Sequence, residues 1–378
     1  MKKNVERIAL PSLSPGTHRE LTAHRYGTAG ARPRAYLQAA LHADEHPGLL
    51  ALNHLIRMLD EGRDPVAGEI VIVPVANPIG LSQQLHGYLV GRYDFSGGLN
   101  FNRDFPDLSE TVAEVVEGKL GDDALDNARM IREVLASAVA DLPRDSELKA
   151  LRAVLLGLSM TSDVVLDVHC DLEALVHIYA SHHHRDIAVE LGADLGASVV
   201  LLEEEAGGNP FDEANAGLWW KLRDRLSDDR IPIACFAATV ELRGQADVSD
   251  ELAAADAASL YRFLQRRGMI GGAPGPLPRP LCEPTPLDGT DVVAAPVAGI
   301  VVYKKRLGDR VEKGEVVAEM VDLTADDPLA ARTPVHSRAS GLFFSRQVQK
   351  LLTPGTSVCK VAGAEKLPHR KAGNLLEA

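Results

Sequence analysis

Residues that could bind a metal gather where a predicted strand meets a predicted helix. In the segment LHADEHPG, His42 and Glu45 follow an apolar strand pattern (34–41), and Pro47 comes just after them. Proline disfavours helical backbone at the residue before it and fits the first position of a helix. We therefore expect His42 and Glu45 on the turn between strand and helix, where open α/β sheets bind ligands. The same letters also fit a helical H-x-x-E-H zinc motif with His42 and His46 as ligands, which is the less favoured alternative.

A third ligand is expected from the end of another strand. His169 closes the apolar run DVVLDVH (163–169). Two imidazole nitrogens and one carboxylate oxygen are a common zinc donor set that leaves one position open for water. Taken singly, His42 and Glu45 could equally well cap a turn, and His169 could equally well be a core histidine without a metal. Taken together, His42, Glu45 and His169 predict one Zn²⁺ per chain, and Asp167 is placed to orient an imidazole.

Two arginines are candidates for binding a substrate. Asn102 and Arg103 lie in GLNFNRDFP (98–106), a loop bounded by glycine and proline. A guanidinium next to an amide suits the bidentate capture of a carboxylate. Arg92, in VGRYD, is a second candidate, although a solvated loop arginine explains it equally well. The pattern therefore predicts a small substrate that bears a carboxylate.

A carboxylate on a late strand is the candidate for proton transfer. Glu241 lies within AATVELRG (237–244), where an unpaired carboxylate would be costly. It could pair with Arg243, which shares its strand face. A carboxylate beside a metal-activated water can also accept a proton and deliver it to a leaving amine. Tyr179, at the end of a predicted strand (176–180), is a further substrate-binding candidate.

The elements that must position these residues alternate between strands and helices. Helical patterns cover 48–59, most of 108–157 and 249–268, the last with Ser249 as N-cap and Gly268 as its end. Apolar strands lie between them, at 34–41, 69–78, 163–169, 176–180, 198–204 and 235–242. Nearly continuous apolar strands indicate an α/β sheet with helices on both faces.

A boundary is expected at residues 271–290, which contain six prolines and four glycines. Such a segment cannot form a helix or a central strand and acts as a semi-rigid linker. It would separate a catalytic domain (1–270) from a small β-domain (291–363) and a tail (364–378). Two β-rich halves with Gly-containing turns predict a small barrel that resembles a lipoyl or biotinyl domain. The segment between the halves has no lysine to carry a prosthetic group.

Composition limits the class of protein. The chain of 378 residues has 40 Lys and Arg against 53 Asp and Glu, a net charge of −13, which disfavours nucleic acid as a partner. No apolar run is long enough for a membrane span or a signal peptide. Four scattered cysteines predict a reducing, cytoplasmic compartment. Homo-oligomerisation stays open.

These motifs together resemble the succinylglutamate desuccinylase/aspartoacylase branch of the zinc carboxypeptidase superfamily. The likeness rests on LHADEHPG, GLNFNRDFPD and TVELRG and covers roughly residues 30–265. It implies a mixed sheet with helices on both faces and a β-rich C-terminal domain. It also implies that Glu241 is the general base and acid, that Asn102 and Arg103 hold a substrate carboxylate, and that Arg92 polarises the scissile carbonyl. The role of Arg92 rests on this resemblance alone.

The sequence thus favours a zinc-dependent hydrolase that removes the acyl group of a small N-acyl amino acid or related amine. Two alternatives remain. A metallocarboxypeptidase for short peptides would use the same site with a longer cleft. A non-catalytic metal- or ligand-binding protein would lack hydrolytic activity altogether.

Overall fold

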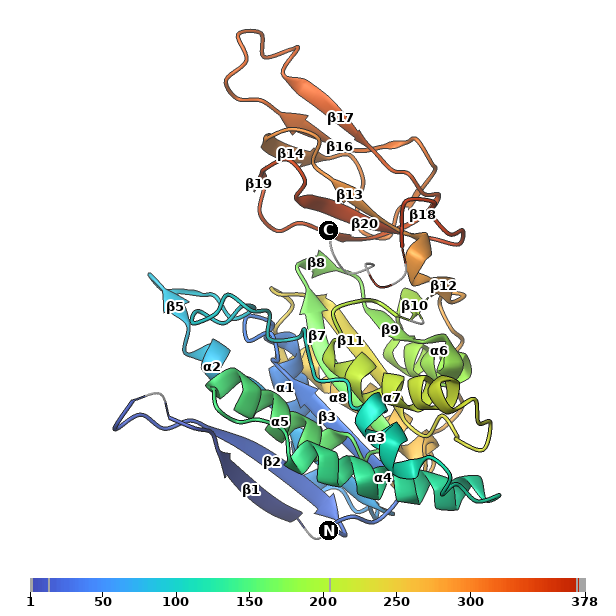
Figure 1. Ribbon diagram of the computed structural model, residues 1–378. Helices are drawn as coiled ribbons and strands as arrows, with labels where there is room; N and C mark the ends of the chain where they lie inside the picture. The colour runs from blue at the N-terminus through green and yellow to red at the C-terminus, as the bar shows by residue number, and fades with distance from the viewer. Residues whose placement is uncertain (1–2, 13, 204, 372, 374–378) are drawn as a thin grey trace. The chain divides into compact units, whose positions relative to one another are not determined.

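The computed structural model describes residues 3–12, 14–203, 205–371 and 373 (Figure 1). Its Cα positions form two compact units. The first holds the chain up to His169, Gly208–Val240 and Val248–Leu277. The second holds Cys170–Gly207, Glu241–Asp247 and the chain from Pro278 onwards. Each unit is therefore built from stretches that are far apart in the sequence.

A mixed sheet forms the centre of the first unit, with neighbouring strands in the order β1-β2-β4-β3-β7-β11. Strand β3 is parallel to both β4 and β7, whereas β2 is antiparallel to β1 and β4. The last residues of β7 and β11 belong to the second unit. The strands are β1 (Lys3–Ala9), β2 (Glu20–Gly27), β3 (Arg34–Ala39), β4 (Glu69–Val73), β7 (Val164–Asp171) and β11 (Phe236–Gly244), with a hairpin of β5 (Gln84–Leu85) and β6 (Tyr88–Leu89) beside them.

Helices cover both faces of this sheet, as the apolar strands predict. Tyr36 and Val165 join an apolar cluster with residues of the helices α3, α4, α5 and α7. Ala39 and Val168 lie on the opposite face because side chains alternate along a strand, and there they pack against Gly48 of α1. The helices are α1 (Pro47–Glu61), α2 (Pro78–Leu81), α3 (Ser109–Val116), α4 (Ala124–Ala140), α5 (Glu147–Ser159), α7 (Phe211–Leu226) and α8 (Asp250–Arg266).

Two details of the helix predictions are confirmed. The side chain of Ser249 accepts a hydrogen bond from the Leu252 N–H and caps α8. Helix α1 begins at Pro47. The predicted departure from helical backbone at His46 is wrong, because this residue has φ −88° and ψ −24°. The proline therefore marks the start of the helix without forcing the preceding residue into an extended conformation.

The second unit contains short parallel strands, a helix and antiparallel sheets. Strand β10 is parallel to β9 and β12. The antiparallel sheets have the strand orders β13-β20-β18-β15 and β17-β16-β14-β19. Closure into a barrel therefore stays a prediction. The elements are β8 (Glu173–Ala174), β9 (His177–Ser181), α6 (Arg185–Leu195), β10 (Val199–Glu203), β12 (Thr285–Pro286), β13 (Thr290–Ala294), β14 (Gly299–Tyr303), β15 (Arg310–Val311), β16 (Val316–Val321), β17 (Arg332–His336), β18 (Gly341–Arg346), β19 (Leu351–Leu352) and β20 (Ser357–Gly363), with short 3₁₀ helices at His182–His184 and Leu287–Gly289.

The C-terminal sheets are joined to the middle of the chain within this unit. Strand β8 pairs with β18, so that Glu173 lies opposite Arg346. The Lys360 ammonium lies 2.7 Å from the Asp171 carboxylate. These contacts explain why Cys170–Gly207 groups with the C-terminal region. The domain boundary at 271–290 stays a prediction, and the predicted tail (364–378) is described only at 364–371 and 373.

A buried histidine gives the second unit a predictable acid sensitivity. His177 is fully buried, and its Nδ1 lies 2.8 Å from the Leu175 carbonyl oxygen. Burial lowers the pKa of His177 to about 4, although the Asp171 carboxylate opposes this shift and Lys360 adds to it. The folded pKa lies below the unfolded one, so the unfolded chain takes up this proton first as the pH falls. Stability is therefore present above about pH 6.5 and lost towards pH 4, by about 3 kcal/mol.

Urea unfolding between pH 7 and pH 4.5 measures this loss. Over this range about 2 kcal/mol of the loss is expected, and His177→Gln should reduce the pH dependence of the unfolding free energy by that amount. A matched substitution of an exposed histidine, His18→Gln, should leave the dependence as in the wild type. If the unfolding free energies of the wild type and His177→Gln depend equally on pH, His177 is not the source of the acid sensitivity.

Candidate metal centre

The parallel pair of β3 and β7 brings the two candidate histidines to one edge of the sheet. Ala39 of β3 lies opposite Val168 of β7, so His169 comes at the carboxyl end of the pair. Directly after β3, Ala40 takes a left-handed conformation with φ 58°, which turns the chain sharply. His42 and Glu45 then lie between this turn and α1. The position inferred from the sequence is therefore confirmed for His42 and Glu45, whereas β7 continues beyond His169 to Asp171.

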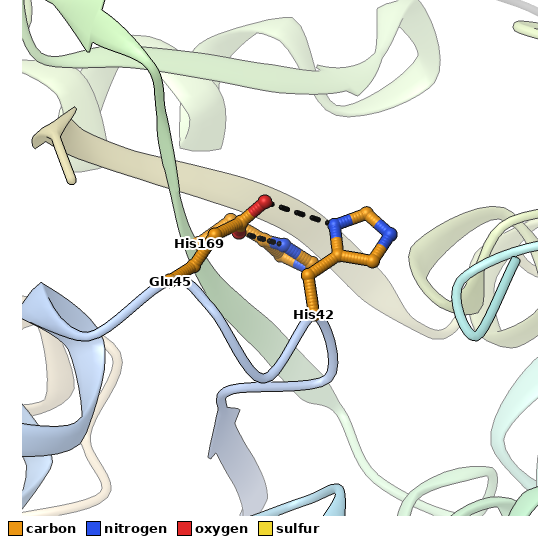
Figure 2. A group of neighbouring side chains, drawn as sticks. All are labelled: His42, Glu45 and His169. Carbon is orange, nitrogen blue, oxygen red and sulfur yellow. Dashed lines mark hydrogen bonds and ion pairs between the residues drawn. The ribbon is translucent and has the colours of Figure 1, made fainter. Parts of the chain in front are cut away.

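The three side chains converge on one point (Figure 2). His42 Nδ1 lies 3.0 Å from Glu45 Oε1, and His169 Nδ1 lies 2.6 Å from Glu45 Oε2. One potential ligand atom of each residue lies within 4.8 Å of the others. All three residues are buried. His46, the alternative ligand of the helical motif, is not part of this group.

The remaining imidazole nitrogens face acceptors. His42 Nε2 lies 2.8 Å from Asn100 Oδ1, and His169 Nε2 lies 2.8 Å from Asp167 Oδ2. These acceptors favour a proton on each Nε2 and leave each Nδ1 with a free lone pair for a metal. The contact of Asp167 with the His169 imidazole is the one that the sequence predicts, whereas nothing in the sequence pointed to Asn100.

A buried hydrogen-bond chain fixes Asp167. Gln38 Nε2 donates to Asp167 Oδ1 at 3.0 Å, and the Tyr36 hydroxyl donates to Gln38 Oε1 at 2.8 Å. All three residues are fully buried. Sequence reasoning missed Gln38, although a single amide within the apolar strand RAYLQAAL was a signal that could have found it.

The charges of the group suit a cation. Burial alone would raise the pKa of Glu45, but the imidazoles of His169 and His42 outweigh it and hold the pKa well below its ordinary value. Burial lowers the pKa of His42, and the nearby Arg92 guanidinium lowers it further. The carboxylate is therefore ionised and the His42 imidazole neutral, which are the forms that bind a metal. Burial would lower the pKa of His169, but the carboxylates of Asp167 and Glu45 outweigh it and raise the pKa well above its ordinary value, so a metal would displace a proton from this imidazole.

Arg92 reaches the same group. Its Nη1 donates to Glu45 Oε1 at 2.9 Å, and the side chain is 43% exposed. The chain before it passes close to the Ala43–Asp44 backbone, because the Ala43 N–H donates to the Gly91 carbonyl at 3.0 Å. A Cβ on Gly91 would lie 2.7 Å from the Asp44 nitrogen, so this approach requires glycine. The Arg92 guanidinium thus contacts the candidate ligand Glu45 while part of the side chain remains exposed to solvent.

Asn102 and Arg103 lie beside His169 and at the start of α7. Asn102 Nδ2 lies 3.3 Å from His169 Nε2, while its Oδ1 accepts a hydrogen bond from the Phe211 N–H. Arg103 Nη1 donates to the Asn102 carbonyl at 2.6 Å. Burial lowers the pKa of Arg103, and so does the charge of Arg92. In the part of the chain that the structure describes, no carboxylate forms an ion pair with Arg103, so its charge is free to meet an anion.

Glu241 and Tyr179 belong to the second unit. Glu241 is partly buried on β11, and Tyr179 is buried on β9. Burial raises the pKa of the Tyr179 phenol; the Lys360 ammonium opposes this shift, and the charge of Glu241 adds to it. The roles expected for them from the sequence stay predictions.

The donor set and its surroundings fit a divalent metal. Two imidazole nitrogens and one carboxylate converge in a buried site. The outer nitrogen of His42 faces Asn100 Oδ1, and that of His169 lies 2.8 Å from Asp167 Oδ2. This is the donor set of catalytic zinc sites with an open fourth position. The sheet and the cluster at its carboxyl edge therefore define a candidate metallohydrolase.

Comparison with known proteins identifies the family. The family model for the succinylglutamate desuccinylase/aspartoacylase catalytic domain matches residues 31–267. The chain belongs to the succinylglutamate desuccinylase/aspartoacylase family, as its motifs predicted. None of the curated proteins matches it.

Solved structures of similar proteins extend the likeness to nearly the whole chain. A protein of this family from Shewanella amazonensis is 25% identical, with a TM-score of 0.82 over 96% of this chain and 98% of that one. A second, from Shewanella frigidimarina, is 21% identical, with a TM-score of 0.84 over 96% and 97%. The ectoine utilization protein EutE (DoeB) from Ruegeria pomeroyi is 19% identical, with a TM-score of 0.65 over 96% and 95%. The last two likenesses establish the fold alone.

Among the helices of the described residues, none is long and apolar enough to cross a membrane.

Proposed function

We propose that this chain is a zinc-dependent hydrolase that cleaves the amide bond of a small N-acyl amino acid or a related N-acylated amine. The observation that carries the proposal is the convergence of His42, Glu45 and His169 on one buried point. Membership of the desuccinylase/aspartoacylase family supports hydrolysis of an acyl amide rather than of a peptide. The compartment proposed for it is the cytoplasm.

His42, Glu45 and His169 would hold one zinc ion. When bound, zinc lowers the pKa of water and polarises a carbonyl oxygen. Arg92, which lies against Glu45 and extends into solvent, would hold the carbonyl oxygen of the scissile amide. Arg103, which has no described carboxylate partner, would bind the substrate carboxylate with help from Asn102. This anchoring would fix the amide before bond cleavage.

Glu241 would move the proton. A carboxylate can accept a proton from the attacking water and donate it to the leaving nitrogen. Tyr179 would contribute a hydroxyl to the binding of the substrate. The assignment of Glu241 also follows the family motif, whereas that of Tyr179 rests on its position at the end of a strand.

Release of free amine from a panel of N-acyl amino acids by the zinc-loaded protein tests the proposal. We expect turnover of at least one member and its loss in His169→Ala. Turnover of blocked dipeptides alone would favour the carboxypeptidase. No turnover of either class by the zinc-loaded protein would favour the non-catalytic alternative.

The hydrogen-bond chain behind His169 gives a prediction for metal affinity. In Asp167→Asn, the amide oxygen can face either His169 or Gln38. If it faces His169, the new amide nitrogen lies against the Gln38 Nε2 donor, and Gln38 cannot turn around because its Oε1 accepts from the Tyr36 hydroxyl. Neither orientation of the asparagine satisfies both neighbours. We expect zinc affinity to fall about 10- to 100-fold.

Competition with a chromogenic chelator measures this affinity. The matched control is Asp291→Asn, a substitution at a fully buried aspartate of β13 that pairs with Arg338. It should leave zinc affinity unchanged. Equal affinities for Asp167→Asn and the wild type would show that this chain does not tune the site.

A further inference from the structure

A second cavity lies in the first unit, at the end of the parallel strands that is opposite the metal centre. Arg34 begins β3, Glu69 begins β4 and Asp163 directly precedes β7, and all three line this cavity. Its volume is about 1440 Å³, whereas small-molecule pockets commonly measure roughly 300–1,000 Å³. Strand β3 alone spans roughly 17 Å between this cavity and the turn that carries His42. The cavity is therefore a separate place at which a small molecule can bind.

Positive charge is in excess among the least exposed side chains of the lining. The side chains of Arg34, Arg132 and Arg25 are 7%, 12% and 21% exposed. The carboxylates at comparable depth are those of Glu69 and Asp163, at 2% and 28%. The charged lining residues nearer the solvent are Arg32, Arg129, Glu6, Asp126 and Glu133. Water and salt screen these outer charges, so the deep part of the cavity suits an anion with a single charge.

Several N–H groups of these arginines have no acceptor among the described residues. Arg25 uses Nε for Glu6 and Nη1 for Glu69, which leaves Nη2. Arg132 uses Nη2 for Asp163 and for a backbone carbonyl, which leaves Nη1, and its buried Nε also lacks an acceptor. Hydrogen bonds from a charged donor to a carboxylate are about twice as strong as those between neutral groups. The hydrogen-bonding capacity of both guanidinium groups is therefore not filled by the protein itself.

The guanidinium groups also repel one another. Burial lowers the pKa of Arg34, although the Glu69 carboxylate opposes this shift. The charges of Arg25 and Arg32 lower the pKa of Arg34 further. Burial lowers the pKa of Arg132 as well, and the charge of Arg32 adds to the shift. An anion among these groups would relieve the repulsion.

Helix α4 contributes an apolar stripe to the wall of the cavity. Leu125, Ala128, Arg132 and Ala136 line the cavity and follow one another at helical spacing. An alanine lies one turn before and one turn after Arg132, so α4 itself leaves space beside the guanidinium. The Leu125 side chain is 81% exposed. An inorganic ion would leave this stripe uncovered, whereas the hydrocarbon part of an organic acid can pack against it.

We propose that this cavity is a binding site for an organic monocarboxylate. The carboxylate meets Arg25 and Arg132, and the hydrocarbon part packs against the apolar stripe of α4. The site shares no residue with the candidate metal ligands, so its occupancy does not require zinc. The inference is independent of the hydrolase activity proposed above.

Isothermal titration calorimetry of the zinc-free full chain with hexanoate tests the proposal. We expect saturable binding of hexanoate and no binding of hexylammonium, which has the same hydrocarbon part and the opposite charge. Arg25→Gln/Arg132→Gln should weaken hexanoate binding at least about tenfold, because it removes both guanidinium groups. The matched control is Arg7→Gln/Arg57→Gln, which removes two exposed arginines outside the cavity and should bind as the wild type does. Circular dichroism checks that each variant is folded.

Ala136→Glu decides the question if the double variant does not fold. Ala136 is exposed on α4, and glutamate is a good helix former, so this variant should fold. The new carboxylate lies one turn from Arg132 and competes for its guanidinium, so hexanoate should bind at least about twofold more weakly.

Three results would overturn the proposal. The first is the absence of saturable binding to the wild type up to about 10 mM hexanoate. The second is hexylammonium binding as tight as that of hexanoate. The third is wild-type affinity in both cavity variants, and its loss in Arg103→Gln would then place hexanoate at the candidate metal centre.

Discussion

Glu241→Gln is expected to lower kcat by about 10²- to 10⁴-fold and to leave the zinc content at one ion per chain. Glutamine has nearly the shape of glutamate but cannot accept a proton at neutral pH. Proton transfer from water and to the leaving amine would both fail, while ligands on other residues would keep the metal. Steady-state kinetics together with elemental analysis of the same preparation measures both quantities.

Glu251→Gln is the control for this variant, because Glu251 is an exposed carboxylate in the first turn of α8. It should retain the kcat of the wild type. A Glu241→Gln enzyme with unchanged kcat would remove Glu241 from the mechanism. One that loses both kcat and zinc would indicate a role in metal binding or folding instead.

His42→Ala and His169→Ala are expected to abolish zinc binding and with it hydrolysis. Each substitution removes one of the two imidazole nitrogens that face Glu45. The loss of affinity should exceed the roughly 10- to 100-fold effect of an outer partner such as Asp167. Elemental analysis after dialysis against zinc-free buffer should find less than a tenth of an ion per chain.

His46→Ala is the matched control, since His46 is adjacent to the ligands in sequence but outside the converging group. It should retain zinc. Loss of zinc in His46→Ala, with retention in His169→Ala, would revive the helical H-x-x-E-H motif.

The central part of the site could be predicted because it depends on local rules. Pro47 marks the start of α1, so His42 and Glu45 had to lie on a turn. The apolar run before His169 identified a strand end, and parallel neighbours present their carboxyl ends at one edge. No long-range information was needed beyond the assumption that the two strands lie close together.

The rest of the site depends on contacts between distant segments. Asn100 reaches His42 from the segment 84–100, and Gln83 and the close approach of Gly91 hold the path of this segment. The sequence indicates a loop there but not its course. Asn102 had been assigned to substrate binding, yet its amide lies against His169 and caps α7, so much of its hydrogen-bonding capacity is used within the protein.

In the fold, too, the features set by local patterns could be predicted, whereas those set by contacts between distant segments could not. Apolar strands between amphipathic helices predicted the α/β sheet and its helices, and Ser249 and Gly268 mark the ends of α8 closely. The two N-terminal strands β1 and β2 were missed because they are not continuously apolar: more and less buried residues alternate along them, and many of the residues are charged. The grouping of Cys170–Gly207 with the C-terminal sheets depends on pairs such as Asp171 with Lys360, which composition cannot reveal.

The claim on which the account depends is that the three convergent side chains bind one metal ion. Anomalous diffraction at the zinc absorption edge, from crystals of the zinc-loaded wild type, tests it most directly. The account predicts one peak per chain, within bonding distance of His42 Nδ1, His169 Nδ1 and the Glu45 carboxylate. No peak at this position, or a peak only elsewhere on the chain, would contradict it.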